Sequence, residues 1–131
     1  MSLLEIDKEN LPRHIAVIMD GNGRWAKKKG QRREYGHRAG RKAVKRIVES
    51  CAELKIKNLT LYAFSTENWN RPKLEIDFLM QLLLLSLKDE LKNLNKNNIK
   101  FKTIGNLERL PKKISDYLLK VKEETKDNSA L

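Results

Sequence analysis

The sequence predicts an α/β fold in a single domain, residues 1–131, with a largely parallel sheet flanked by helices. Two short apolar runs, the first of them β-branched, each end in a polar loop, and a helical pattern follows each loop. Strand–helix alternation of this kind implies parallel strands joined by right-handed crossovers. With 131 residues, 40% of them apolar, the chain is long enough for one core and too short for two.

The first strand is expected at His14–Met19, as a buried parallel strand that stops at the turn sequence Asp20-Gly21-Asn22-Gly23. A helix is expected at Gly36–Leu54, because apolar residues recur there at three- and four-residue spacings. The second strand is expected at Leu59–Phe64, and a polar loop follows it as far as Pro72. The two polar loops therefore follow the carboxyl ends of two strands.

A long helix is expected at Lys73–Asn95, with too many apolar residues for one stripe, so its middle should be covered on more than one side. A third strand at Ile99–Ile104 and a polar helix at Pro111–Lys126 complete the alternation. Three parallel strands would leave an unpaired sheet edge. We therefore expect an incomplete sheet, whose further strands are absent from the chain or supplied by another one, and a leader or disordered arm at residues 1–10.

Composition narrows the function classes. The 28 Lys and Arg residues outnumber the 17 Asp and Glu residues, so the formal net charge of +11 favours an anionic partner. The single cysteine, Cys51, excludes an internal disulfide and a multi-cysteine metal site, and it fits a cytoplasmic protein. No apolar stretch approaches the roughly 18 residues of a membrane-spanning helix, and no secretory signal precedes the fold.

Ligands of open α/β sheets bind beyond the carboxyl ends of the strands, where both polar loops are expected. Gly21 and Gly23 allow backbone N–H groups to approach a phosphate. The Asp20 carboxylate would repel that phosphate unless Mg²⁺ lay between them, so Asp20 is a predicted magnesium ligand. Eleven Lys and Arg residues and one acid lie at Arg24–Arg46, and arginine binds phosphate oxygens well. Each feature alone also fits a structural role, as a turn, a solvated helix face or packing tryptophans.

Three separated segments resemble the cis-prenyltransferases, the family of the bacterial undecaprenyl diphosphate synthases: HIAVIMDGNGRWA at 14–26, Gly36-His37 with Gly40, and YAFSTENWNRP at 62–72. The resemblance implies an enzyme that condenses isopentenyl diphosphate onto an allylic diphosphate such as farnesyl diphosphate, with Mg²⁺. Its product would be a long-chain polyprenyl (undecaprenyl) diphosphate for the lipid carrier of cell-wall synthesis. The resemblance runs over residues 11–131, about the N-terminal half of the family's length, so we expect this chain alone to turn over poorly or not at all.

The resemblance also implies roles for single residues. Asp20 would hold Mg²⁺ and act in catalysis with Asn68, which we interpret as an orienting group because a neutral amide is a poor base. Glu75 would help to order the loop over the substrate. The implied substrate-binding residues are Gly21, Asn22, Gly23, Arg24, Trp25, Arg33, His37, Ser65, Thr66, Glu67, Trp69 and Arg71. The candidates to line a hydrophobic tunnel for the growing chain are Leu82, Leu83 and Leu85. A homodimer and peripheral membrane contact through the lipid product are also implied, and no nucleic-acid partner is expected.

Three alternatives remain open at the level of sequence. Gly21-x-Gly23-x-x-Ala26 fits a permissive dinucleotide-binding fingerprint, but the acidic residue expected about 20 positions on, at the end of the second strand, is missing. The basic stretch Arg24–Arg46 fits a nucleic-acid-binding module, whose affinity would fall steeply with salt. A non-catalytic subunit of the same family is the third alternative, and the presence of Asp20 and Asn68 argues against it.

Overall fold

The structure is a computed structural model that describes residues 5–131, apart from the side chain of Thr66. Its elements are β1 (His14–Ile18), α1 (Asn22–Lys28), α2 (Arg33–Glu53), β2 (Asn58–Tyr62), the 3-10 helix η2 (Thr66–Asn70), α3 (Lys73–Lys96), the 3-10 helix η3 (Leu107–Arg109) and α4 (Lys112–Glu124). The predicted α/β class and the order of its helices are confirmed, and α1 is an addition. The N-terminal arm was expected at residues 1–10, of which residues 1–4 lie outside the described residues. Within the rest of the arm, the Asn10 N–H donates to the Asp7 carbonyl at 3.2 Å.

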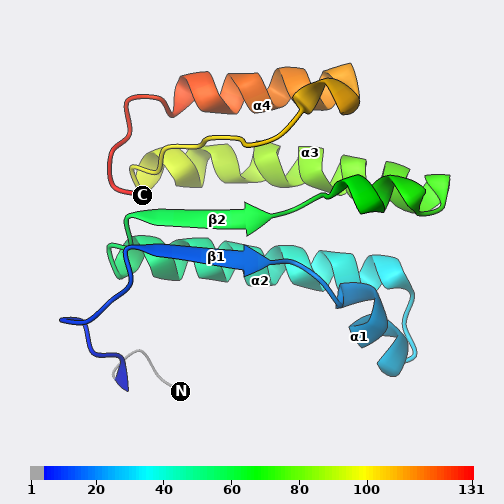
Figure 1. Ribbon diagram of the computed structural model, residues 1–131, viewed down its shortest axis with the longest axis horizontal. Helices are drawn as coiled ribbons and strands as arrows, with labels where there is room; N and C mark the ends of the chain where they lie inside the picture. The colour runs from blue at the N-terminus through cyan, green and yellow to red at the C-terminus, as the bar shows by residue number, and fades with distance from the viewer. Residues whose placement is uncertain (1–4) are drawn as a thin grey trace.

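The two strands pair in parallel, in a register that runs from His14 opposite Asn58 to Ile18 opposite Tyr62. Figure 1 shows α2 alongside this sheet, with α3 and α4 stacked beyond it. The expectation of buried strands is wrong for one face, because Ile18 is 77% and Tyr62 56% exposed. Alternate residues of β1 are exposed, so residues 5–131 cover only one side of the strand.

The predicted third strand at Ile99–Ile104 is not formed among the described residues. This segment runs extended beside α4, and its backbone groups bond elsewhere: Lys100 N–H donates to the Leu131 carbonyl at 2.8 Å. The Phe101 N–H donates to the Thr125 hydroxyl at 3.0 Å. These contacts with the C-terminal residues take the place of a sheet ladder.

The core lies on both sides of α3. Its α3 residues meet α4 on one side, and partly buried residues of α2 on the other. The buried cluster consists of Met80, Leu84, Leu87, Leu94, Ile99, Ile114, Leu118 and Val121. The prediction that the middle of α3 is covered on more than one side is therefore confirmed. Among the tunnel candidates, Leu82 and Leu83 are half-buried and Leu85 is 51% exposed.

Thr125 ties the extended segment to α4, and its substitution is expected to lower stability. Its fully buried hydroxyl accepts from Phe101 N–H and donates to the Val121 carbonyl at 2.8 Å. Thr125→Val keeps the shape but leaves the part-buried Phe101 N–H without its partner, so the free energy of unfolding should fall by about 1–3 kcal/mol. Urea denaturation measures this. Thr125→Ser, which keeps the hydroxyl, should lose less, and an equal loss in both variants would contradict this role of the hydrogen bonds.

Candidate functional site

The loop after β1 fixes one exposed carboxylate. Gly21 has φ of 84°, a conformation that glycine adopts readily, and its N–H donates to Asp20 Oδ1 at 2.7 Å. The other oxygen, Asp20 Oδ2, lies 3.7 Å from the Arg24 guanidinium. The Asp20 side chain is 67% exposed, so it remains accessible to a ligand at the end of the strand.

Two glycines of α2 allow this loop to pack against the helix. A Cβ atom at Gly36 would lie 1.9 Å from the backbone oxygen of Asn22, and one at Gly40 would lie 2.3 Å from its side-chain nitrogen. At Gly36 the clash is with backbone, so only a hydrogen atom there leaves room for the first turn of α1, whereas at Gly40 the clash is with a side chain. Gly36 and Gly40 belong to one of the segments that carry the family resemblance, and their four-residue spacing on one helix face is the signal that indicates this contact.

A third close approach joins the loop to an arginine. A Cβ atom at Gly23 would lie 2.9 Å from the Arg33 guanidinium carbon. Gly23 itself is buried. The loop that carries Asp20 therefore lies directly beside a cation from the first turn of α2, and an anion bound at the loop would lie within reach of that cation.

Three basic side chains from two distant segments meet at one carboxylate oxygen. Glu75 Oε1, in the first turn of α3, lies 3.5 Å from Arg33 Nε, 3.6 Å from His37 Nε2 and 3.2 Å from the nearer Arg71 nitrogen. The Glu75 side chain is only 14% exposed, so these contacts are weakly screened by solvent. We call Arg33, His37, Arg71 and Glu75 the Glu75 cluster, and it connects the loop after β2 to α2.

His37 is held in its neutral form. Burial lowers the pKa of His37, the positive charges of Arg33 and Arg71 lower it further, and the negative charge of Glu75 opposes them. Its Nε2 atom is buried and has no hydrogen-bond partner among residues 5–131. His37 Nε2 therefore faces the Glu75 carboxylate at 3.6 Å, beyond hydrogen-bond distance, with Arg33 and Arg71 on the same carboxylate oxygen.

This lowered pKa predicts a pH dependence of stability. The unfolded chain binds a proton at His37 near its ordinary pKa of 6.5, before the folded chain does. Stability is therefore expected to fall as the pH drops from about 6.5 toward the folded pKa. Urea denaturation of the wild-type chain and His37→Gln across this range should show a smaller loss in the variant. His14→Gln, which removes the exposed histidine, is the matched control, and equal slopes for wild type and His37→Gln would contradict the assignment.

The loop after β2 is ordered by its own side chains. Asn68 Oδ1 accepts from the Ser65 N–H at 2.7 Å and from the Ser65 hydroxyl at 3.0 Å. Trp69 meets Phe64 edge to face at 4.9 Å, and the Arg109 guanidinium lies 5.3 Å from the Trp69 ring centre. The amide oxygen of Asn68 is thereby occupied, so its NH₂ group is the part that remains to contact a ligand.

The structure brings some of the predicted site residues together and separates others. Arg33, His37 and Arg71 meet in the Glu75 cluster, with Gly23 beside them. Trp25 stacks on Tyr35, away from that cluster, with ring centres 5.8 Å apart. Sequence reasoning gave Glu75 only an ordering role, and its spacing from Arg71, four residues along the chain, was the one local signal of their ion pair.

The described residues fit one kind of magnesium site. Within residues 5–131 no group of three or more His, Cys, Asp or Glu side chains is arranged to hold a metal. Mg²⁺ is commonly bound by one or two carboxylates together with substrate phosphates and water. The exposed carboxylate of Asp20, which lies 3.7 Å from the Arg24 guanidinium, fits that mode, in which the diphosphate supplies part of the ligand set.

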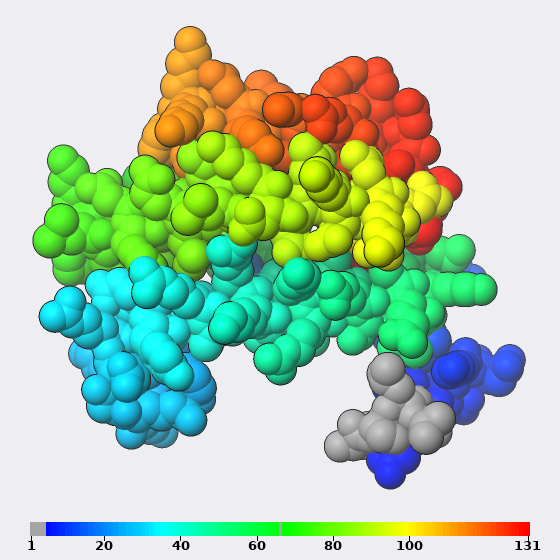
Figure 2. All heavy atoms as spheres, turned by 180° about the vertical axis from the view of Figure 1, so that it is seen from behind, coloured from blue at the N-terminus to red at the C-terminus, as the bar shows by residue number. Residues whose placement is uncertain are grey.

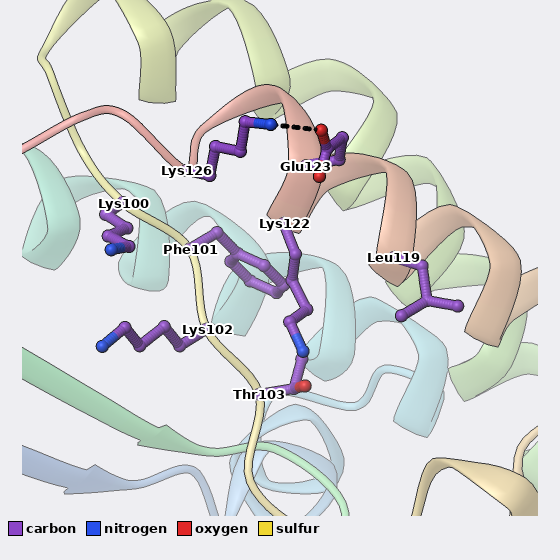
Figure 3. Close-up of a pocket in the computed structure, with 8 residues that line it drawn as sticks. All are labelled: Lys100, Phe101, Lys102, Thr103, Leu119, Lys122, Glu123 and Lys126. Atoms are coloured by element: carbon purple, nitrogen blue, oxygen red, sulfur yellow. Dashed lines mark hydrogen bonds and ion pairs between the residues drawn. The ribbon is translucent and has the colours of Figure 1, made fainter.

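A hollow elsewhere is not part of this site. It has a volume of about 460 Å³ and lies between residues 100–103 and the last turns of α4 (Figure 3). Figure 1 places that end of α4 and the helix α1 at opposite ends of the molecule. The strand-end loops and the Glu75 cluster therefore form a separate region.

Comparison with known proteins decides the family. The model of the family described as "Putative undecaprenyl diphosphate synthase" matches residues 18–131. The chain belongs to this family. An isoprenyl transferase of Clostridium tetani is 49% identical over 127 residues, 97% of this chain and 50% of the relative. Dehydrodolichyl diphosphate synthase 2 of Arabidopsis thaliana is 50% identical over 127 residues, 97% of this chain and 41% of that protein.

Solved structures agree with this family. The lavandulyl diphosphate synthase of Lavandula x intermedia, crystallised with dimethylallyl diphosphate, superposes with a TM-score of 0.87 at 35% identity, over 92% of this chain and 52% of that one. A probable undecaprenyl diphosphate synthase of Campylobacter jejuni gives a TM-score of 0.73 at 41% identity, over 93% of this chain and 52% of that one. The chain thus spans about half the length of these family members. Among the described residues, no helix has the length and apolar character to span a bilayer.

Proposed function

We propose that this chain carries the allylic diphosphate site of a cis-prenyltransferase. The observation that carries the proposal is the Glu75 cluster, in which cations from the two strand-end regions gather beside Gly23 and the Asp20 loop. The reaction is the condensation of isopentenyl diphosphate with an allylic diphosphate such as farnesyl diphosphate. Two facts support it: the family membership, and a structural relative crystallised with an allylic diphosphate.

In this reaction the allylic carbon–oxygen bond breaks, a carbon–carbon bond forms to isopentenyl diphosphate, and a proton leaves the latter. Arg33 and Arg71 bind the leaving diphosphate, because paired N–H donors match phosphate oxygens. The neutral His37 donates a hydrogen bond to it through a protonated ring nitrogen. Asp20 would hold Mg²⁺ together with the diphosphate, and the ion would neutralise charge on the leaving group.

Asn68 orients the second substrate. With its carbonyl oxygen occupied by Ser65, its NH₂ group donates to isopentenyl diphosphate near the reacting carbon. A diphosphate oxygen is a better proton acceptor than a neutral amide, so we assign the proton removal to a substrate diphosphate.

The wider setting follows from the same proposal. The product is a long-chain polyprenyl diphosphate of the undecaprenyl type, which serves as a lipid carrier in cell-wall synthesis. We place the protein in the cytoplasm, as a homodimer in peripheral contact with the inner face of the plasma membrane, because its product is a lipid. Nucleic acid is not among the proposed partners.

Product analysis tests the proposal. A chimera in which residues 1–131 replace the matching half of the Clostridium tetani relative is incubated with farnesyl diphosphate, isopentenyl diphosphate and Mg²⁺. Mass spectrometry should detect polyprenyl diphosphates from the chimera and little product from the 131-residue chain alone. A correctly folded chimera that binds both substrates and makes no product would contradict the proposal, and would favour a non-catalytic family subunit.

A further inference from the structure

An exposed aromatic pair stands at one end of the molecule, and neither ring belongs to the Glu75 cluster. Trp25 of α1 and Tyr35 of the first turn of α2 stack with their ring planes 5° apart. They are 41% and 47% exposed. Figure 2 shows that α1 and the start of α2 project from the body as a separate lobe. Large aromatic side chains exposed together indicate an interaction surface.

The charges around this pair are predominantly positive. The only acidic residue between positions 24 and 38 is Glu34. Four exposed cations of this region make no ion pair within residues 5–131. They are Lys27, Lys28, Lys29 and Arg32. We call these four cations with Trp25 and Tyr35 the basic aromatic tip. A surface of this charge is complementary to a polyanionic partner.

The contacts within the tip favour a lipid surface over a nucleic acid. Bases stack on open aromatic faces, whereas the Trp25 ring already stacks on Tyr35 and has Lys29 Nζ 4.9 Å from its centre. Tryptophan and tyrosine at the headgroup level, with lysine stems that extend along apolar surface, are typical of membrane interfaces. Each basic residue near an anionic bilayer strengthens binding by about fivefold.

We propose that the basic aromatic tip docks on an anionic lipid bilayer, with Trp25 and Tyr35 at the headgroup level and the four cations against the lipid phosphates. The inference deepens the proposed function and rests on it, since the lipid product gives the contact its purpose. The loop at Asp20 leads directly into α1, so docking holds the diphosphate site at the membrane surface. The tip thereby specifies which end of the molecule faces the lipid.

Vesicle cosedimentation tests the tip. The 131-residue chain is mixed with vesicles of phosphatidylcholine with phosphatidylglycerol, and with vesicles of phosphatidylcholine alone. Binding is expected to the anionic vesicles only. The triple variant Lys27→Gln, Lys28→Gln, Arg32→Gln should lower the partition coefficient by about a hundredfold, and Tyr35→Ser should lower it further. Circular dichroism verifies that each variant is folded.

The matched control changes the same net charge on another surface. Lys42→Gln, Arg46→Gln and Lys57→Gln remove three exposed cations outside the tip and should lower the partition coefficient by less than about threefold.

An equal loss in both triple variants would overturn the proposal, as would displacement of the chain from vesicles by inorganic pyrophosphate with Mg²⁺. Binding of a single-stranded oligonucleotide in place of vesicles would also overturn it. Product formation by the chimera is measured separately, in detergent micelles. Loss of vesicle binding can therefore be told apart from loss of the proposed reaction.

Discussion

Gly36→Ala is expected to separate α1 from α2 and to abolish diphosphate binding. The new Cβ atom would lie 1.9 Å from the Asn22 backbone oxygen, a contact that no side-chain rotation can relieve. Alanine is a better helix former than glycine by about 1 kcal/mol, so intrinsic propensity alone would stabilise α2. We nevertheless expect the free energy of unfolding to fall by about 3 kcal/mol, at the upper end of overpacking costs. Urea denaturation and pyrophosphate calorimetry measure the two effects.

Gly40→Ala is the matched control on the same helix face. Its Cβ atom would meet the Asn22 side-chain nitrogen at 2.3 Å, and this flexible amide can rotate away. A loss of less than about 1.5 kcal/mol is therefore expected there. If Gly36→Ala were as stable as the wild-type chain and bound pyrophosphate equally well, the close packing of α1 on α2 would not be what positions the loop.

Asp20→Ala is expected to lower product formation by the chimera about 10²–10³-fold. A carboxylate that helps to neutralise a leaving diphosphate through Mg²⁺ acts where charge develops, and loss of one such electrostatic contact typically has an effect of about this size. The fold should be unaffected, because the Asp20 side chain is 67% exposed. Initial rates at saturating Mg²⁺, with mass-spectrometric detection of products, measure the change.

Asp116→Ala serves as the control for that substitution. Asp116 is an exposed carboxylate of α4, and its removal should change the initial rate by less than about twofold. Equal activity in wild type and Asp20→Ala would remove Asp20 from the proposed magnesium site. An Asp20→Ala rate that recovers fully at higher Mg²⁺ would instead limit its role to metal affinity.

Periodicity predicted the long elements well and the short ones poorly. The apolar repeats of α2 and α3 extend over many turns, so their type and their ends followed from the sequence. The seven-residue helix α1 was missed, because a basic stretch of that length has almost no apolar face. The segment Ile99–Ile104 was expected as a strand that continues the alternation of strand and helix. Its actual partners, Leu131 and Thr125, lie more than twenty residues away, so no local sequence pattern indicates them.

The candidate site shows the same division between local and distant signals. Asp20 and the glycines after it were found because their chemistry is readable within one loop. An acidic residue in the first turn of a helix, as at Glu75, fits a favourable interaction with the helix dipole and needs no other explanation. Its partners Arg33 and His37 lie on α2, about forty residues earlier. Only the three-dimensional structure shows that this carboxylate gathers them.

The central claim is that two separate loops form one diphosphate site. Backbone amide chemical shifts of the isotope-labelled chain, recorded as inorganic pyrophosphate is added with Mg²⁺, test it most directly. The amides of residues 20–24 and 65–71 should shift together, with a common midpoint, while those of the hollow at residues 100–103 stay unchanged. Shifts confined to one of the two loops, or different midpoints for the two, would contradict a single site.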